Sequence, residues 1–350
     1  MLNIFKKKAQ TLLGVDLNPA AIRLVELSRE EGCYTVENYA IMALPYGAIV
    51  ERQVVQAEIV AQILKQLINQ TRPRVKQAAM ALAGAAVITK TIEMDAGLNE
   101  DELASVLRLE AQQHIPYSME DVAIDFIVQP KEEQAADKVS VLLAASREEN
   151  INVRENILSL AGLRAKVIEI EGHALARACR FVEQHSGIAT DGSVLAVIDV
   201  GVDSLTLNIL QHGFLVYSRE QTFATELIAQ LQQHCFRSTS AEAVPAKIAQ
   251  GIIFTDLMGV KTHILEHITR AFQFFYGTSH YSSVDCIIVS GVTLLLAGLE
   301  SAVQSQFNTP TVLANPFVNM KLSKKLDESR LAIDAPALLV ACGLAMREEG

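Results

Sequence analysis

The feature that most constrains the fold of this chain is a segment that occurs twice. Alternating apolar side chains predict three short β-strands at 12–17, 22–27 and 34–42, followed by an amphipathic helix at 57–68. The same order of strands and helix is predicted at 194–199, 205–210, 214–217 and 224–233. The two blocks align without a gap when Asp16 is placed on Asp199, and Leu24 then falls on Leu207. This repetition predicts two related halves.

The repeat places one carboxylate at the same point of each half. Asp16 and Asp199 each end a predicted strand and enter a tight turn. If the halves face each other, both carboxylates face one cleft, where they suit a hydrated Mg²⁺ ion. Hairpin turns also present backbone N–H groups to phosphate oxygens, and the turn 201–204 begins with a glycine that permits close approach. A single aspartate can simply cap its own turn, so the matched pair is what favours a ligand site.

Composition restricts the classes of function. The chain has 350 residues, which is about two domains, and 50% of them are apolar. Its net charge of −10 argues against broad nucleic-acid binding. The longest uncharged apolar stretches, 78–88 and 335–346, are shorter than the ~20 residues that cross a bilayer, so we expect no transmembrane span. The five cysteines form no C-x-x-C pair, which predicts neither a disulfide framework nor a zinc site and favours the cytoplasm.

A stretch between the two repeats, 85–146, is expected to form a small subdomain of its own. Asn99 and Glu102 form a capping-box pattern before a helix that ends near His114. Strands are predicted at 87–94, 122–128 and 139–145, with a polar loop at 129–138. Further helices are predicted at 148–161, 174–184, 240–250, 256–276 and 336–347, and further strands at 165–170 and 284–290.

Several of these segments also carry recognisable motifs. Residues 13–16 and 198–201 match the two phosphate motifs of the actin-like ATPase superfamily, 288–291 the turn that supports adenosine, and 335–345 the closing helix. Three more stretches, 87–90, 110–117 and 315–317, are typical of one family within it. Over nearly its whole length the chain therefore resembles the PilM family of type IV pilus assembly.

The resemblance implies an α/β chain with a two-lobed actin-like ATPase fold and a small inserted α+β subdomain, as in FtsA. The first lobe would comprise residues 1–84, 147–190 and 335–350, the inserted subdomain 85–146, and the second lobe 191–334. The implied function is that of a cytoplasmic scaffold, not an enzyme, with ATP and Mg in the interlobe cleft. Whether such a scaffold also hydrolyses ATP slowly is left open.

The resemblance also implies partners. A groove beside the inserted subdomain would bind the short N-terminal cytoplasmic peptide of a PilN-like membrane protein, which would keep the chain peripheral to the inner membrane. Pilus motor ATPases are further candidate partners. The peptide could add a strand to a sheet edge or lie as a short helix in a groove, and both modes remain open.

Twelve residues are expected to bind the nucleotide, and Asp16 and Asp199 among them are the expected metal ligands. The twelve are Gly14, Asp16, Asn18, Arg23, Asp199, Gly201, Asp203, Ser204, Glu242, Lys247, Gly291 and Val292. Two departures from the family pattern predict weaker binding. Pro19, in the first turn, has no N–H to donate, and Val292 adds bulk where a second glycine is common.

Two other functions stay open beside the scaffold. The fold would permit a phosphotransferase of the sugar-kinase type, although no general base for it is evident in the sequence. A filament-forming protein like FtsA is the other alternative. The first eight residues pair apolar side chains with three lysines, which suits either weak contact with an anionic membrane or a frayed tail.

Overall fold

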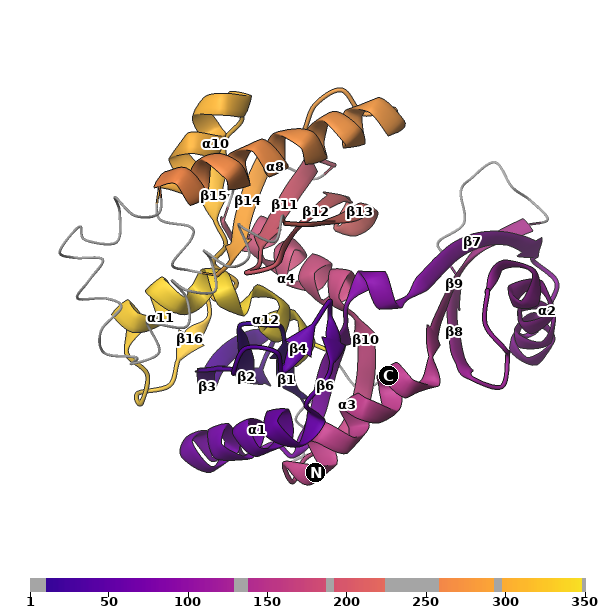
Figure 1. Cartoon of the computed structure of the whole chain (residues 1–350), viewed down its shortest axis with the longest axis horizontal. Helices are drawn as coiled ribbons and strands as arrows, with labels where there is room; N and C mark the ends of the chain where they lie inside the picture. The colour runs from indigo at the N-terminus through magenta and orange to yellow at the C-terminus, as the bar shows by residue number, and fades with distance from the viewer. Residues whose placement is uncertain (1–10, 129–137, 187–191, 224–257, 293–297, 348–350) are drawn as a thin grey trace, which may run out of the picture.

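The computed structural model describes residues 11–128, 138–186, 192–223, 258–292 and 298–347. Two large sheets form the body of the molecule, and a small sheet with its own helix extends to one side (Figure 1). We call the first sheet and its covering helices the first lobe, and the second sheet and its helices the second lobe. The predicted helices at 224–233 and 240–250, most of the loop at 129–138 and the first eight residues lie outside the described residues.

The first sheet has the strand order β10-β6-β1-β2-β3-β16. Its bounds are β1 Leu13–Leu17, β2 Ala21–Glu30, β3 Cys33–Ala43, β6 Gln77–Leu82, β10 Arg164–Ile170 and β16 Lys321–Leu322. The second sheet has the order β13-β12-β11-β14-β15. Its bounds are β11 Val194–Val200, β12 Ser204–Gln211, β13 Phe214–Thr222, β14 Cys286–Gly291 and β15 Thr311–Leu313. Apart from β16, which pairs with β3, the two sheets follow one topology.

The duplication extends to the register of individual residues. In the β1–β2 hairpin Asp16 lies opposite Arg23, and in the β11–β12 hairpin Asp199 lies opposite Thr206. The offset that relates Asp16 to Asp199 also relates Arg23 to Thr206, and it holds for every pair of the first hairpin. Even the bulge after Glu26 in β2 recurs at the equivalent place in β12. The predicted repeat of strands is confirmed.

Helices cover both faces of each sheet. The face of the first sheet turned away from the second lobe is covered by α1 (Ala57–Thr71) and α3 (Glu148–Leu160). The outer face of the second sheet is covered by α8 (Met258–Thr278) and α10 (Leu299–Phe307). Between the two lobes lie α4 (Glu171–Ser186) and α12 (Leu339–Ala345), with α11 (Glu328–Asp334) and the 3₁₀ turn η2 (Ala335–Leu338) leading into α12 (Figure 1).

Helix α12 approaches β1 more closely than an ordinary helix–sheet contact allows. A Cβ atom on Gly14 would lie 2.0 Å from the backbone oxygen of Ala341, so only glycine fits there. Gly14 was expected to bind the nucleotide, and its position in β1 also has this packing role. The predicted helix at 336–347 is divided, because Pro336 starts a 3₁₀ turn before the α-helix begins.

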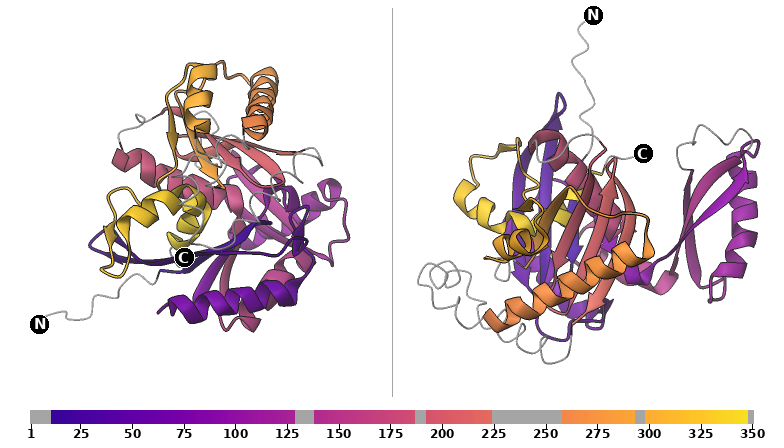
Figure 2. Two further views of the ribbon diagram at one scale, coloured as in Figure 1. Left: turned by 60° about the vertical axis from the view of Figure 1, so that its left-hand side comes forward. Right: turned by 90° about the horizontal axis from the view of Figure 1, so that it is seen from above.

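The inserted subdomain is a three-stranded antiparallel sheet with one helix. The strand order is β7-β9-β8, with β7 at Ile88–Asp95, β8 at Val122–Val128 and β9 at Lys138–Arg147. Helix α2 (Glu100–His114) covers one face through Leu103 and Leu107. Its predicted capping box is confirmed, since Asn99 Oδ1 accepts from Glu102 N and Glu102 Oε2 accepts from Asn99 N, both at 3.0 Å. Viewed from above, the subdomain stands apart from the two large sheets (Figure 2).

Two elements join the subdomain and the first helix to the body. A short 3₁₀ turn, η1 (Gly84–Ala86), leads into β7, and Ser146 Oγ donates a 2.8 Å hydrogen bond to the Ala86 backbone oxygen. A small hairpin of β4 (Ile49–Val50) and β5 (Gln53–Val54) precedes α1 and was not predicted from the sequence.

No helix in the described part of the chain is long and apolar enough to cross a membrane.

Candidate functional site

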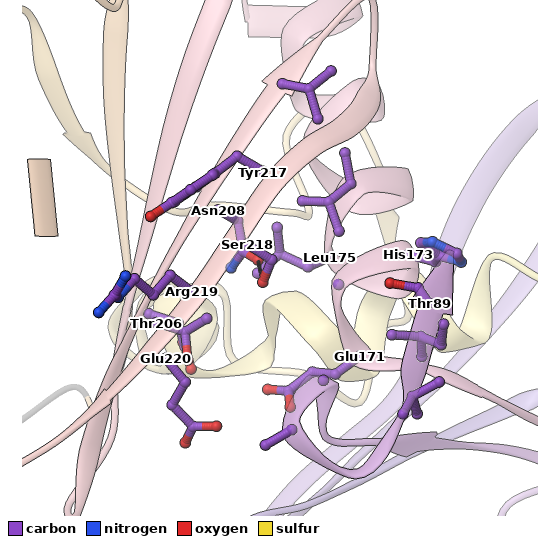
Figure 3. A pocket seen from close by; sticks show the side chains of 18 of the residues that line it. Thr89, Glu171, His173, Leu175, Thr206, Asn208, Tyr217, Ser218, Arg219 and Glu220 are labelled. Carbon is purple, nitrogen blue, oxygen red and sulfur yellow. Dashed lines mark hydrogen bonds between the residues drawn. The ribbon is translucent and has the colours of Figure 1, made fainter. Parts of the chain in front are cut away.

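The site lies in a cavity of about 810 Å³, which we call the interlobe cavity. One wall comes from the start of α4, at Glu171 and His173, and from β7, at Thr89. The opposite wall comes from β11–β13 and includes Asp199 and Glu220. Figure 3 shows the side chains of β12 and β13 on one side of this space, with those of α4 and β7 on the other. The cavity therefore lies between the second lobe and the inserted subdomain, beside the start of α4.

Asp16 and Asp199 end the first strands of the two repeats, as predicted. Asp16 is buried, and Arg23 Nη1 donates a 3.1 Å hydrogen bond to its Oδ2. Burial raises the pKa of Asp16, Arg23 opposes this effect, and the charge of Asp199 adds to it. This electrostatic effect indicates that the two repeats bring their carboxylates near each other. Asp199 lines the interlobe cavity and accepts a 2.8 Å hydrogen bond from Ser290 Oγ on β14.

Glu171 is a third carboxylate near Asp16 and Asp199, and it was not predicted from the sequence. We call Asp16, Asp199 and Glu171 the acidic group. It is the first residue of α4 and immediately follows β10. Burial raises its pKa to about 7, Arg52 opposes the shift, and Asp16 and Asp199 add to it. A carboxyl group with a pKa near 7 can exchange a proton at physiological pH. The signal in the sequence was an acidic residue directly after a predicted strand at 165–170, close to the strand-end placement that identified Asp16 and Asp199.

Arg52, at the tip of the β4–β5 hairpin, is the second residue that the sequence analysis missed. Its Nε donates a 2.7 Å hydrogen bond to Glu220 Oε1, and its Nη2 donates one of 3.1 Å to Ser204 Oγ. Its Nη1 lies 3.9 Å from Glu171 Oε2. Arg52 belongs to the first lobe, whereas Ser204 and Glu220 belong to β12 and β13 of the second lobe. The guanidinium group thus connects the two lobes beside the expected phosphate-binding turn.

The first turn has its backbone donors in use. Asn18 Oδ1 accepts hydrogen bonds from the N–H groups of Ala20 and Ala21, both at 3.0 Å. The Asn18 N–H itself donates to the Ala21 backbone oxygen at 3.2 Å, and Pro19 has no N–H. Asn18 therefore holds the turn together, and this turn has little to offer a phosphate through its backbone.

The second turn is arranged differently. The Gly201 N–H donates to the Ser204 backbone oxygen at 2.8 Å. Ser204 Oγ donates to Glu220 Oε1 at 2.7 Å, and burial raises the pKa of Asp203. The turn therefore places a hydroxyl group and a carboxyl group, Ser204 and Asp203, next to Arg52.

The expected adenosine-binding residues lie at the end of β14. Gly291 has a φ of +118°, and a Cβ atom there would lie 2.2 Å from the Val200 backbone oxygen. The Val292 N–H donates to the same oxygen at 2.9 Å, and its side chain packs against the core of the second lobe. Glu242 and Lys247, the two remaining expected nucleotide-binding residues, lie outside the described residues.

One observation bears on whether these residues fit a magnesium nucleotide. Arg23 Nε is buried and has no hydrogen-bond partner among the described residues, so this donor is available to an anionic ligand. Over the same residues, no three His, Cys, Asp or Glu side chains are close enough to hold a metal ion by themselves. Mg²⁺ needs only one or two protein carboxylates, with water and phosphate oxygens as its other ligands. Arg23 and Asp199 therefore fit such a ligand.

The sequence model of the family described as "Type IV pilus assembly protein PilM" matches residues 14–349 of this chain. The chain belongs to the PilM family. Its structure is similar to that of a solved PilM–PilN type IV pilus biogenesis complex, with a TM-score of 0.78 and 23% identity over 97% of this chain and 98% of that chain. It is also similar to the ethanolamine utilization protein EutJ from Carboxydothermus hydrogenoformans, with a TM-score of 0.52 and 14% identity over 96% and 89% of the two chains. This PilM-family chain thus has the predicted actin-like ATPase fold.

Proposed function

We propose that this PilM-family chain is a cytoplasmic scaffold of type IV pilus assembly that binds the N-terminal peptide of a PilN-like membrane protein and holds Mg-ATP between its lobes. The observation that carries the proposal is the interlobe cavity, because Asp199 and Glu171 line it together with Thr89 and Thr91 of the inserted subdomain. The similar PilM–PilN complex supports the choice of partner. Peptide binding would place the chain at the inner membrane without a span of its own.

The edges of two sheets favour strand addition as the binding mode. Strand β13 ends the order of the second sheet, and β7 ends that of the inserted sheet. Six consecutive residues of β13, 215–220, line the cavity, and Thr89 and Thr91 of β7 line it from the other side. An edge strand presents unpaired N–H and C=O groups that an extended peptide can bind. The apolar Val216 and Leu142 would then receive alternate side chains of the peptide.

The nucleotide would lie deeper in the cavity, near the acidic group. Arg23 would bind a phosphate oxygen, Asp199 would bind Mg²⁺ directly or through water, and the turn at Gly201 would approach the phosphates. The bound Mg²⁺ would neutralise phosphate charge that the surrounding carboxylates repel. The backbone N–H groups of the first turn already donate hydrogen bonds within the turn. We therefore expect weaker nucleotide binding than in a typical actin-like ATPase.

Glu171 favours slow ATP hydrolysis as a second activity. Its pKa of about 7 suits it to accept a proton from water at neutral pH. Glu171→Gln would remove that capacity and retain the size of the side chain. Phosphate release in the wild type that the variant lacks would support the activity, and equal release would exclude Glu171 as its base.

The peptide proposal can be tested by calorimetric titration of the full chain with a synthetic peptide of the PilN-like N-terminus. Val216→Glu would place a carboxylate on the edge of β13 beside the acidic group. Leu160→Glu is the matched control, because Leu160 is 48% exposed, Val216 is 45% exposed, and Leu160 does not line the cavity. We expect Val216→Glu alone to weaken binding by about tenfold or more. Equal affinities of the two variants would contradict this binding site.

A further inference from the structure

The β4–β5 hairpin has an unfavourable turn. Its two turn residues, Glu51 and Arg52, have φ angles of +49° and +62°. A two-residue hairpin with both angles positive is normally built from Asn and Gly, because a Cβ atom disfavours this backbone region. Neither residue belongs to those types, so contacts outside the turn must stabilise it.

The Arg52 side chain supplies those contacts. All three guanidinium nitrogens face acceptors, namely Glu220 at 2.7 Å, Ser204 at 3.1 Å and Glu171 at 3.9 Å. The side chain is only 12% exposed, so water contributes little to its solvation. These interactions fix the Arg52 side chain strongly, because a buried guanidinium that lost its acceptors would be desolvated without compensation. The strained turn is thus held by interactions with Ser204 and Glu220 of the second lobe and with Glu171 at the start of α4.

We infer that Arg52 is a latch between the lobes: it holds the β4–β5 hairpin of the first lobe against β12 and β13 in the absence of nucleotide and must release Ser204 and Glu220 when the nucleotide phosphates enter. The inference rests on the nucleotide site proposed above. Ser204 begins β12 directly after the expected phosphate-binding turn, and its hydroxyl is engaged by Arg52 and Glu220. The guanidinium therefore occupies the polar groups that a phosphate and its Mg²⁺ would otherwise contact.

Electrostatics makes the two states exclude each other. The carboxylates of Glu171 and Glu220 attract one cation, and the Arg52 guanidinium supplies that charge in the latched state. A Mg²⁺ ion near the same carboxylates would repel the guanidinium and favour its departure. Once released, the Glu51–Arg52 turn could relax from its positive φ angles, which lowers the cost of opening.

The test compares Arg52→Gln with Arg72→Gln in the full chain. Arg72 is the matched control, because it is also an arginine with positive φ, at +48°, but it is an exposed residue at the end of α1. Small-angle scattering without nucleotide would report the separation of the lobes, and calorimetry would report the affinity for Mg-ATP. We expect Arg52→Gln to increase the radius of gyration and to tighten Mg-ATP binding by roughly tenfold, with no change in Arg72→Gln.

Each outcome decides the inference. An unchanged radius of gyration in Arg52→Gln would overturn the latch, and so would weaker Mg-ATP binding, because Arg52 would then be a ligand of the nucleotide. If none of the proteins binds Mg-ATP, the proposed nucleotide site fails, whereas the scattering result still decides whether Arg52 holds the lobes together. Glu220→Ala removes the closest partner and keeps Arg52, so it should open the lobes as well if Arg52→Gln does not fold.

Discussion

Arg23 and Asp16 are direct cross-strand neighbours in the β1–β2 hairpin, and they form a buried ion pair at 3.1 Å. Both were expected to bind Mg-ATP separately, Arg23 through phosphate and Asp16 through the metal. The pair leaves the charge of Asp16 largely compensated. Asp199, at the equivalent point of the second hairpin, lies opposite Thr206 and accepts its hydrogen bond from a neutral serine. The two repeated aspartates are therefore unequal, and we expect Asp199 to be the stronger metal ligand of the two.

We expect Asp199→Ala to weaken Mg-ATP binding by more than about tenfold. Of the two repeated aspartates, Asp199 is the one whose charge no arginine compensates, and the variant removes it. Asp125→Ala is the control, since Asp125 lies exposed on β8 of the inserted subdomain. Calorimetry would measure both affinities, and circular dichroism would check that both variants stay folded. An unchanged affinity in Asp199→Ala would refute its role as a ligand.

Removing one member of the buried ion pair should be costly. We expect Arg23→Ala to lower the free energy of unfolding by about 3–5 kcal/mol, because Asp16 would remain buried without its partner. The double variant Asp16→Ala/Arg23→Ala leaves no unpaired charge and should recover a large part of this loss. Urea denaturation of the wild type, Asp16→Ala, Arg23→Ala and the double variant would measure the coupling. If the double variant lost as much as the sum of the single variants, the pair would contribute no specific interaction.

The raised pKa of Glu171 predicts a stability that depends on pH. With a pKa of about 7 in the folded protein, against 4.5 for an ordinary glutamate, the folded state holds its proton longer than the unfolded state does. Stability should then fall as pH rises from about 4.5 to 7, by up to about 3 kcal/mol. The charged groups that act on Glu171 are Arg52, Arg154, Asp16, Asp199 and Glu220.

Glu171→Gln isolates this effect from that of Asp16, whose pKa burial also raises. The variant should be more stable than the wild type above pH 7, and the difference should shrink towards pH 5. Thermal denaturation at pH 5, 6, 7 and 8 would measure it. A difference that stayed constant over this range would mean that the Glu171 pKa is close to that of the unfolded chain.

The end of β14 should tolerate no side chain at Gly291. An alanine Cβ would meet the Val200 backbone oxygen in a backbone region that L-residues avoid, so Gly291→Ala should cost more than about 2 kcal/mol. Gly259→Ala is the control, because it lies on α8 with nothing within 4 Å of the added atom. The control should change stability by less than about 1 kcal/mol in urea denaturation. Equal effects would show that β14 can move away from β11.

Much of this fold can be predicted from the sequence, because apolar residues recur with a regular period in its helices and strands. The strands of the two repeats were predicted to within a few residues, since alternation marks half-buried strands and the repeat supplies each twice. The exception is β13, which continues beyond the predicted 214–217 to Thr222. Its last residues carry polar side chains that face the cavity, so burial leaves no apolar pattern there. The β4–β5 hairpin was missed because Glu51 and Arg52 give no turn signal.

The site was less accessible than the fold. Asp16 and Asp199 could be identified because each lies near the end of a strand. Glu171 directly follows β10, but no repeat in the sequence pairs it with an equivalent residue. Arg52 could not be found in this way, because its partners Ser204 and Glu220 lie far away in the sequence and come close only when the lobes pack. Local pattern reports which residues share an element, whereas these contacts depend on how whole elements are placed.

Helix α12 lies directly on β1, although the two come from opposite ends of the described chain. During synthesis β1 leaves the ribosome long before α12, so the part of the first sheet that α12 covers stays exposed until α12 has been made. The inserted subdomain has its own core, which is made entirely in that interval. The order of synthesis therefore leaves apolar surface on β1 and β2 open to unwanted association until the last helix of the described chain packs on it.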